Sequence, residues 1–283
     1  MQRGKNTGGS RSNSKGKTQR PDSKDFSPKR TPKPRFKKEP TAPKMSADGL
    51  IRLNKYISNA GISSRREADN LIKAGLVQVN DKVVTEMGYK VKPGDSVRFN
   101  NEELRAEKKV YLVLNKPKGF ITTMDDPKAR KTVMELISNA GPERLYPVGR
   151  LDRKTTGVLL FTNDGEMATK LMHPSSGARK IYQVSLDKRL TAADFSKIKA
   201  GLTLEDGPIT VDDIAYVDDK SKSNIGLTIH SGRNRIVRRI FESLDYEVTK
   251  LDRVFFAGLT KKNLERGRWR KLGEKEVNFL KMM

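Results

Sequence analysis

A break in composition near residue 49 decides which part of this 283-residue chain can build a hydrophobic core. Residues 1–48 hold 14 Lys and Arg against 4 Asp and Glu, a net charge of +10, with 6 of the 13 prolines and almost no apolar side chains. Such a segment buries too little surface to fold, which predicts a disordered basic tail. It serves either as a solubilising segment or as an arm that follows RNA phosphates. The remainder is long enough for two compact units.

The charge of the whole chain favours nucleic acid as a partner. Its 58 Lys and Arg exceed the 34 Asp and Glu by 24, and a field of this sign attracts polyanions. No stretch approaches the ~18 consecutive apolar residues of a membrane-spanning helix. The first 48 residues also lack the apolar core of a signal peptide. The sequence therefore predicts a soluble cytoplasmic protein with no membrane partner.

The residue inventory limits the chemistry. The chain has no Cys, which excludes disulfides, thiolate chemistry and thiol-ligated metals. His173 and His230 are the two imidazoles, so we expect no metal site. No glycine-rich phosphate loop or dinucleotide fingerprint occurs at a strand-to-helix turn, so we also expect no cofactor. Any reaction would depend on carboxylates, hydroxyls, phenols or cations.

Residues 49–108 predict a small domain with a linker at its end. Apolar spacing indicates a first helix from Leu53 to Gly61, and a capping box opens a second helix at Ser64, which Gly75 closes. A β-rich run from 76 to 84 turns at Asn80-Asp81, and Pro93-Gly94 introduces another strand. Cations beside the helical stripes form either a solvated basic face or an RNA-binding surface. These cations are Arg52, Lys55, Arg65, Arg66 and Lys73.

Residues 109–283 predict a larger domain that mixes strands and helices. The helical patterns cover residues 132–137, 166–172, 191–200 and 234–244. The strand patterns cover residues 110–114, 157–162, 181–186, 209–217 and 225–230.

Asp152 is the leading candidate for a reacting group. It lies in a polar turn between Arg150 and Arg153, just before a buried strand. The adjacent cations favour the ionised carboxylate, which suits an oxygen nucleophile better than a general acid. A structural Asp in a salt bridge explains the same pattern.

Two further segments carry candidate side chains. The predicted helix 234–244 has an apolar face and a cationic face, and the cationic face either lines a cleft that binds phosphate or a carboxylate, or is simply exposed. That face comprises Arg235, Arg238 and Arg239. Tyr182, in the middle of a predicted strand, either packs in the core or stacks on a bound base and exchanges a proton with it.

Two runs of sequence resemble known families. The run Arg52-Leu-Asn-Lys-Tyr-Ile-Ser-Asn-Ala-Gly-Ile-Ser-Ser-Arg-Arg-Glu-Ala-Asp, with Gly75-Leu-Val-Gln-Val-Asn, is similar to the S-four type of RNA-binding module. The segments Gly149-Arg-Leu-Asp152 to Asn163-Asp-Gly165, Lys180-Ile-Tyr182, and Gly232-Arg-Asn-Arg-Ile-Val-Arg238-Arg resemble the RsuA/RluB branch of the pseudouridine synthases. So do Leu114-Asn-Lys-Pro-Lys-Gly and Gly267-Arg-Trp-Arg-Lys-Leu, and the domain order is closest to the RluB type.

The resemblance implies an α+β fold. A small αα-β domain would precede a catalytic domain with a mixed, mainly antiparallel sheet flanked by helices. It also implies an isomerase that converts a uridine of ribosomal RNA, of the large subunit for the RluB type, to pseudouridine. The RNA would be free or part of an assembling subunit, and we expect the enzyme to be a monomer.

The resemblance assigns roles to individual residues. Asp152 would be the nucleophile, either adding to the ribose or assisting glycal formation. Arg238 would pair with Asp152, and Tyr182 would pack on the base and remove a proton from its ring carbon. Arg150 would hold phosphate, and Arg233 and Arg235 would contribute to RNA binding.

One position departs from the family pattern, because Ile236 stands where Gln is common. Two other functions also fit the chain: a non-catalytic ribosome-assembly factor that clamps RNA, and a general nucleic-acid-coating protein that relies on charge alone.

Overall fold

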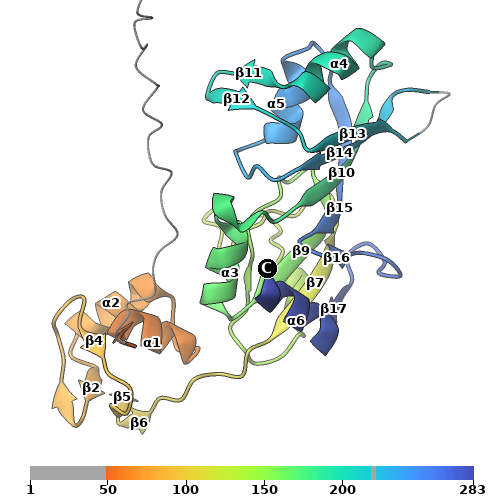
Figure 1. The fold of residues 1–283 in the computed structure, drawn as a ribbon. Coiled ribbons are helices and arrows are strands. Elements are labelled where there is room, and N and C mark those ends of the chain that lie inside the picture. The colour runs from red at the N-terminus through yellow and green to blue at the C-terminus, as the bar shows by residue number, and fades with distance from the viewer. Residues whose placement is uncertain (1–48, 218–220) are drawn as a thin grey trace, which may run out of the picture. The chain divides into compact units, whose positions relative to one another are not determined.

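The computed structural model describes residues 49–217 and 221–283 (Figure 1). The predicted basic tail, residues 1–48, lies outside the described residues. None of the helices in the described part of the chain is long and apolar enough to span a bilayer.

The small domain contains the two helices that the sequence predicts. Helix α1 (Leu53–Asn59) and helix α2 (Arg65–Lys73) pack through buried apolar side chains. The capping box forms, because the Ser64 hydroxyl accepts a hydrogen bond from the Glu67 amide at 3.2 Å and the Glu67 carboxylate accepts one from the Ser64 amide at 2.7 Å.

Short strands complete the small domain. Strands β3 (Lys82–Val83), β2 (Val77–Val79), β5 (Val97–Phe99) and β6 (Glu102–Glu103) form one antiparallel sheet, and β1 (Ile51–Arg52) pairs with β4 (Lys90–Val91). Asn80 and Asp81 have φ of 50° and 63°, as a two-residue hairpin turn requires. The predicted turn at these residues is therefore confirmed.

The larger domain is built on a nine-stranded sheet. Its main path runs β13–β14–β10–β15–β9–β7–β17, with β16 on β15 and β8 on β9. The pairings are antiparallel except for β9 with β15, which are parallel, so the predicted mixed, mainly antiparallel sheet is confirmed. The strands are β7 (Tyr111–Lys116), β8 (Tyr146–Pro147), β9 (Thr156–Thr162), β10 (Lys180–Leu186), β13 (Asp213–Tyr216), β14 (Asn224–Ile229), β15 (Val248–Phe256), β16 (Leu259–Thr260) and β17 (Trp269–Lys271).

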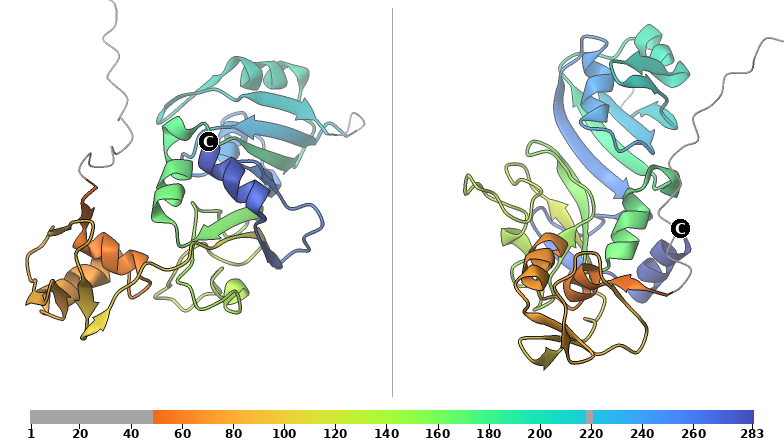
Figure 2. Two further views of the ribbon diagram at one scale, coloured as in Figure 1. Left: turned by 60° about the horizontal axis from the view of Figure 1, so that its bottom comes forward. Right: turned by 90° about the vertical axis from the view of Figure 1, so that its left-hand side faces the viewer.

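Both faces of the sheet are covered, which explains the nearly continuous apolar runs of β7 and β9. Leu112 and Leu159 belong to the core that includes α4 (Ala192–Ala200) and α5 (Ile236–Glu242). Val113 and Val158 point to the other core, with α3 (Gly165–Met172) and α6 (Glu274–Met282). Figure 2 shows α4 and α5 near one end of this domain and α3 and α6 near the other.

Three sequence predictions for the larger domain need correction, and the central strand β15 was missed. The helix expected over 132–137 is only a 3-10 turn, η1 (Glu135–Ile137). The strand expected over 209–217 is interrupted, because β12 (Gly207–Ile209) pairs back on β11 (Leu202–Leu204) before β13 begins. The helix expected over 234–244 is shorter at both ends, and strand β15 was not predicted.

The sheet consists of two halves that meet where β9 lies beside β15. This parallel seam has two residue pairs, Thr156 with Asp252 and Gly157 with Arg253. Gly157 has a φ of 109°, and a Cβ there would collide with the Arg253 carbonyl oxygen and lie 2.7 Å from the Arg253 amide nitrogen. The seam therefore requires glycine at this position.

Candidate active site

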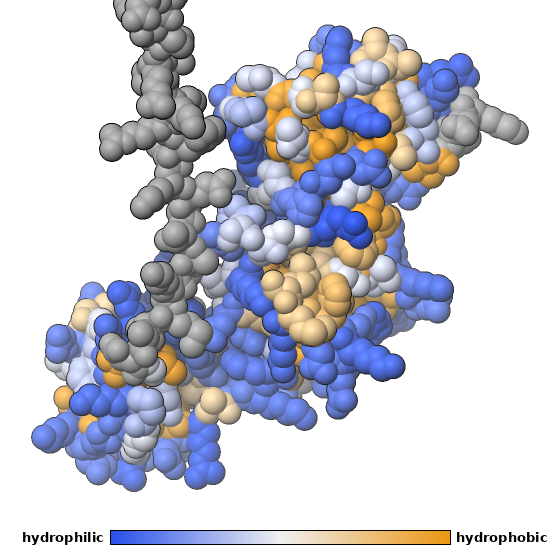
Figure 3. All heavy atoms as spheres, in the orientation of Figure 1, coloured by the Kyte–Doolittle hydropathy of each residue, from blue (hydrophilic) through white to orange (hydrophobic). Residues whose placement is uncertain are grey.

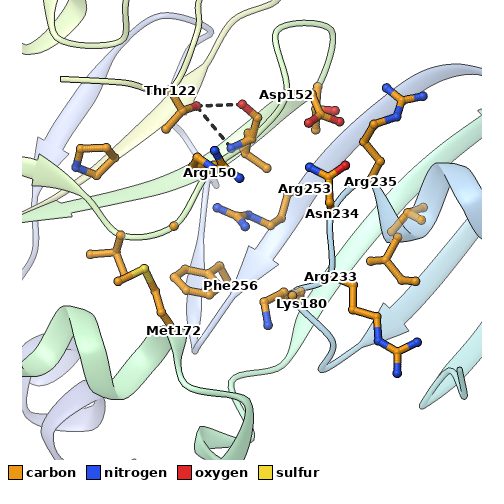
Figure 4. A pocket seen from close by; sticks show the side chains of 18 of the residues that line it. Thr122, Arg150, Asp152, Met172, Lys180, Arg233, Asn234, Arg235, Arg253 and Phe256 are labelled. Atoms are coloured by element: carbon orange, nitrogen blue, oxygen red, sulfur yellow. Dashed lines mark hydrogen bonds between the residues drawn. The ribbon is translucent and has the colours of Figure 1, made fainter. Parts of the chain in front are cut away.

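A cleft of about 820 Å³ lies over the seam of the sheet, and both halves contribute to its walls (Figure 4). The half with β9 supplies the loop before this strand, and the other half supplies β10, β15 and the loop that leads into α5. Among the lining side chains Asp152 is the single carboxylate. Six cations line the same cleft: Arg150, Arg153, Lys180, Arg233, Arg235 and Arg253.

Asp152 is held through its backbone, whereas its carboxylate accepts no hydrogen bond from the described residues. The Thr122 hydroxyl donates to the carbonyl of Leu151 at 2.8 Å, and the Asp152 carbonyl accepts from the Thr155 amide at 3.0 Å. The Asp152 carboxylate has no hydrogen bond within the described residues and is 38% exposed. This arrangement fixes where the carboxylate begins and leaves its oxygens available to a bound molecule.

Lys116 stabilises the same turn through hydrogen bonds to its backbone. It is completely buried, and its ammonium group donates to the carbonyl of Thr155 at 2.9 Å, of Asp152 at 3.1 Å and of Pro117 at 3.2 Å. Burial lowers the pKa of Lys116 to about 8, while the charge of Asp152 opposes the shift. The ammonium group thus supports the backbone that carries Asp152.

Arg238 is the cation nearest to Asp152. Its Nε lies 3.9 Å from Asp152 Oδ2, its Nη1 donates to the Val248 carbonyl at 2.7 Å, and its side chain is only 7% exposed. Nε is buried and has no hydrogen-bond partner among the described residues. Burial lowers the pKa of Arg238, and the Asp152 charge opposes this shift.

The cationic face predicted for the helix 234–244 does not exist as one surface. Arg235 precedes the helix with a left-handed backbone (φ 49°), Arg238 is buried, and Arg239 makes two hydrogen bonds, of 2.6 and 2.8 Å, to Asp206. Because α5 starts at Ile236, Arg235 lies outside the helix, and the helical spacing that placed Arg235 on one face with Arg238 and Arg239 does not apply. Ile236 itself is buried and lines the cleft.

Tyr182 lines the wall of the cleft that β10 forms. It is 9% exposed, so it both packs in the core and borders the cleft, and its hydroxyl has no hydrogen bond within the described residues. Its partner across the strand pair is Arg253 of β15. The structure thus brings Asp152, Tyr182 and Arg238 to one site.

The predicted RNA-binding residues of this domain differ in how many hydrogen bonds and ion pairs they make within the protein. Arg150 makes no ion pair or hydrogen bond with any described residue. Arg233 donates to Asp206 at 3.5 Å and to the Gly207 carbonyl at 3.3 Å, and Arg235 donates to Glu242 at 3.0 Å. Arg150 is therefore the freer of these cations to meet a phosphate.

The remaining predicted RNA-binding residues lie on the small domain. Arg65, Arg66 and Lys73 are exposed on α2, Arg52 is exposed just before α1, and Lys55 is half-buried on α1. Figure 3 shows hydrophilic side chains over much of this domain. These five cations lie on the neighbouring helices α1 and α2 or directly before α1, and together they give a cationic surface.

Three cleft residues were not identified from the sequence. Lys180, Arg253 and Phe256 line the wall formed by β10 and β15. The β-branched and aromatic residues within 248–256 could have indicated the strand, but its neighbour in the sheet is not visible in a local pattern. No group of three or more His, Cys, Asp or Glu suited to a metal occurs within residues 49–217 and 221–283.

Comparison with family models gives two matches. An RNA pseudouridylate synthase model matches residues 110–243, and an S4 domain model matches residues 51–97. These matches coincide with the large sheet and with the small helical domain.

Comparison with individual proteins agrees. The chain is 43% identical over 237 residues to ribosomal large subunit pseudouridine synthase B of Bacillus subtilis, covering 83% of this chain and 97% of that protein. It is 35% identical over 236 residues to the dual-specificity RNA pseudouridine synthase RluF of Escherichia coli, covering 82% and 79%. A crystal structure of a pseudouridylate synthase aligns with a TM-score of 0.59 and 29% identity, covering 81% of this chain and 99% of that one. These similarities confirm the resemblance to the RsuA/RluB branch, and the chain belongs to the RNA pseudouridine synthases, a family of isomerases.

Proposed function

We propose that this enzyme isomerises a uridine of ribosomal RNA, in the large subunit, with Asp152 as its nucleophile. The observation that carries the proposal is a half-exposed carboxylate beside a buried arginine, in a cleft whose other charged lining side chains are all cations. The rRNA target is supported by the name of the Bacillus subtilis relative. The similarity to this chain extends over 97% of that protein.

The reaction exchanges one bond for another at the ribose. The C1′–N1 bond breaks, the uracil rotates in the cleft, and a C1′–C5 bond forms. C5 loses its proton, and N1 gains one, so the reaction needs no net oxidation or hydrolysis. Asp152 acts on the ribose, either by adding to it or by assisting glycal formation. Tyr182, whose hydroxyl is free, packs on the base and takes the proton from C5.

Two groups of cations, one at the cleft and one on the small domain, would bind the RNA. The target base must leave its stack, which costs a few kcal/mol, and phosphate contacts offset this cost. Arg150, Arg233 and Arg235 would contact the RNA at the cleft. Arg52, Lys55, Arg65, Arg66 and Lys73 would dock it on the small domain. We propose that the enzyme works as a cytoplasmic monomer.

Mapping pseudouridine in rRNA tests this function. Unmodified large-subunit and small-subunit rRNA, each free or in assembling particles, is incubated with the full chain and mapped at single-nucleotide resolution. We expect one or a few uridines of the large-subunit RNA to be converted. No conversion in any of these substrates, despite tight RNA binding, would instead favour a non-catalytic assembly factor.

Replacing Arg238 with Met separates catalysis from stability. Met keeps the buried packing but removes the hydrogen bond from Nη1 to the Val248 carbonyl, so we expect the free energy of unfolding to fall by only about 1–3 kcal/mol and the enzyme to stay folded. Turnover should fall at least about 100-fold, because the carboxylate loses the cation that orients it. Chemical denaturation and single-turnover rates measure the two effects. Arg239→Met, which removes a half-buried cation of the same helix that pairs with Asp206 and does not line the cleft, should keep the turnover rate.

Titration of Lys116 should limit the turnover rate at alkaline pH. As the pH rises through about 8, the amine loses a proton and keeps two N–H donors for three carbonyls, so the Asp152 turn loosens. The pKa in the fold is below its ordinary 10.5, so from pH 8 to 10.5 the folded chain binds fewer protons than the unfolded chain. This group therefore makes the fold more stable as the pH rises, and unfolding does not explain the decline.

The pH profile of kcat at saturating RNA checks this prediction. We expect a decline above pH 8 in the wild type. Lys116→Met should be slower at pH 7 and lack that decline. In Lys180→Met the decline should persist, although burial also lowers the pKa of Lys180 to about 8.

A further inference from the structure

Arg253 is a buried cation in the cleft that has no ion pair with any residue the structure describes. Its side chain is 3% exposed, its Nε donates to the Val158 carbonyl at 2.8 Å, and its guanidinium lies 4.6 Å from the centre of the Phe256 ring. Its Nη2 is buried and has no hydrogen-bond partner among the described residues. A guanidinium is expensive to bury in this way, and its free N–H groups match the geometry of an oxyanion.

A β-bulge puts a second cation on the same wall of the cleft. The register of β10 and β15 shifts between Ile181 and Tyr182, so that Lys180 pairs with Phe256 and Tyr182 pairs with Arg253. Lys180 donates to the carbonyl of Ala178 at 3.0 Å and to that of His230 at 2.6 Å, which leaves one N–H unused.

The electrostatics agree with two cations that lie near each other. Burial and, to a smaller extent, the charge of Arg253 together lower the pKa of Lys180 to about 8, whereas Asp212 opposes the shift. In the view of Figure 4 the Arg253 guanidinium points towards Arg150, which has no ion pair or hydrogen bond among the described residues. Arg150, Lys180 and Arg253 thus line one cleft, in which Asp152 is the single carboxylate among the lining residues.

We propose that Arg253 and Lys180 form a binding site for the phosphate group on the ribose of the target uridine. The proposal rests on the proposed function, because it takes the base to lie against Tyr182. Residues directly opposite on an antiparallel pair are close neighbours on one face of the sheet, so Arg253 lies within one nucleotide of that base.

Such a site solves a problem of the reaction. Once the C1′–N1 bond has broken, the uracil must turn while the ribose keeps its place above Asp152. A phosphate held by Arg253 anchors the ribose without touching the base. A role in packing alone would explain the contact with Phe256, but it would be served equally by an apolar side chain such as Met, which brings no buried charge.

Binding of mononucleotides tests the site. Ligand-observed NMR titrations measure the affinity of the full chain for uridine, uridine 5′-monophosphate, uridine 3′-monophosphate and inorganic phosphate. We expect one monophosphate to bind at least about tenfold more tightly than uridine, because charge-assisted hydrogen bonds are strong. In Arg253→Met this preference should drop below about threefold, with the affinity for uridine unchanged.

Matched variants control for charge and folding. Lys154→Met removes an exposed cation that does not line the cleft, and it should keep the preference. Arg253→Lys keeps the charge but loses the forked donors and should give an intermediate value. Thermal unfolding is followed for each variant. A folded Arg253→Met, or a folded Arg253→Lys if Met prevents folding, that retains the full preference overturns the proposal, as does an equal loss in Lys154→Met.

Failure of the site and failure of the proposed function give different results. Asp152→Asn should retain the preference for the monophosphate, since its carboxylate is not a ligand of the phosphate. A retained preference without pseudouridine formation by the wild type would contradict the function and leave the site intact. Pseudouridine formation by a wild type that shows no preference for a monophosphate over uridine would contradict the phosphate site and leave the proposed function intact.

Discussion

Asp152→Asn is expected to lower pseudouridine formation at least about 1,000-fold while leaving the fold and RNA binding in place. Asn has nearly the same size but cannot act as an anionic nucleophile, and loss of a nucleophile typically costs this much or more. The Asp152 side chain has no hydrogen bond within the described residues and one ion pair of 3.9 Å, so the fold depends little on it. RNA affinity should be unchanged or higher, because a negative charge leaves a cationic cleft.

Rates under single-turnover conditions, binding and thermal unfolding are measured on the same preparations. Asp125→Asn is the matched control, because Asp125 is an exposed carboxylate in the nearby loop that does not line the cleft. It should be as active as the wild type. An Asp152→Asn enzyme that still modifies rRNA at a normal rate would remove the basis for the proposed chemistry.

Gly157→Ala is expected to destabilise the larger domain by at least about 4 kcal/mol, enough to unfold much of the protein at 37 °C. The added Cβ would collide with the Arg253 carbonyl oxygen and would lie 2.7 Å from both the Arg253 amide nitrogen and Asp252 Oδ1. Backbone atoms of a central strand cannot move aside cheaply. The positive φ of 109° adds strain for any L side chain.

Asp252 makes the loss larger, because its carboxylate joins several elements at the seam. It accepts from the Thr156 hydroxyl at 2.9 Å and from Arg266 at 3.2 Å, and it pairs with Lys261. Burial raises the pKa of Asp252, but the hydrogen bonds from Arg266, Lys261 and Thr156 outweigh it and hold the pKa below its ordinary value. A Cβ at position 157 would displace this carboxylate from its partners.

Gly226→Ala is the control for the general effect of adding a methyl group to a strand of the same sheet. A Cβ at Gly226 would meet its nearest neighbours at 3.8 Å, an ordinary contact, and its φ is not in the left-handed region. We expect a change within about 1 kcal/mol, in either direction. Chemical denaturation of both variants decides the matter, and equal stabilities would show that the seam tolerates a side chain.

Local patterns predicted much of the fold. The capping box at Ser64 and the turn at Asn80 and Asp81 are confirmed, because each depends on residues within a few positions of one another. The same holds for the strand that contains Val158, whose burial on both faces produces an unbroken apolar run. The neighbours of Asp152 predicted an ionised carboxylate in a polar turn, and the structure places this residue at the wall of the cleft.

What depends on distant contacts was missed or misplaced. The helical spacing grouped Arg238 with Arg235 and Arg239, but α5 starts one residue later than the grouping requires and Arg238 is buried. Arg253 and Lys180 reach the cleft through the pairing of β10 with β15 and its bulge, a relation between segments about 70 residues apart that no local period records.

The cleft residues are gathered at the narrow seam between β9 and β15, and most strands of the sheet lie away from it. Asp152 comes from one half of the sheet, and Tyr182, Arg238 and Arg253 come from the other, so two residue pairs set the spacing of the reacting groups. Loops grafted onto the outer strands β13 and β17, at the opposite edges, would leave that spacing unaltered. An enzyme of this design can be redirected to new RNA targets from its periphery, without retuning its active centre.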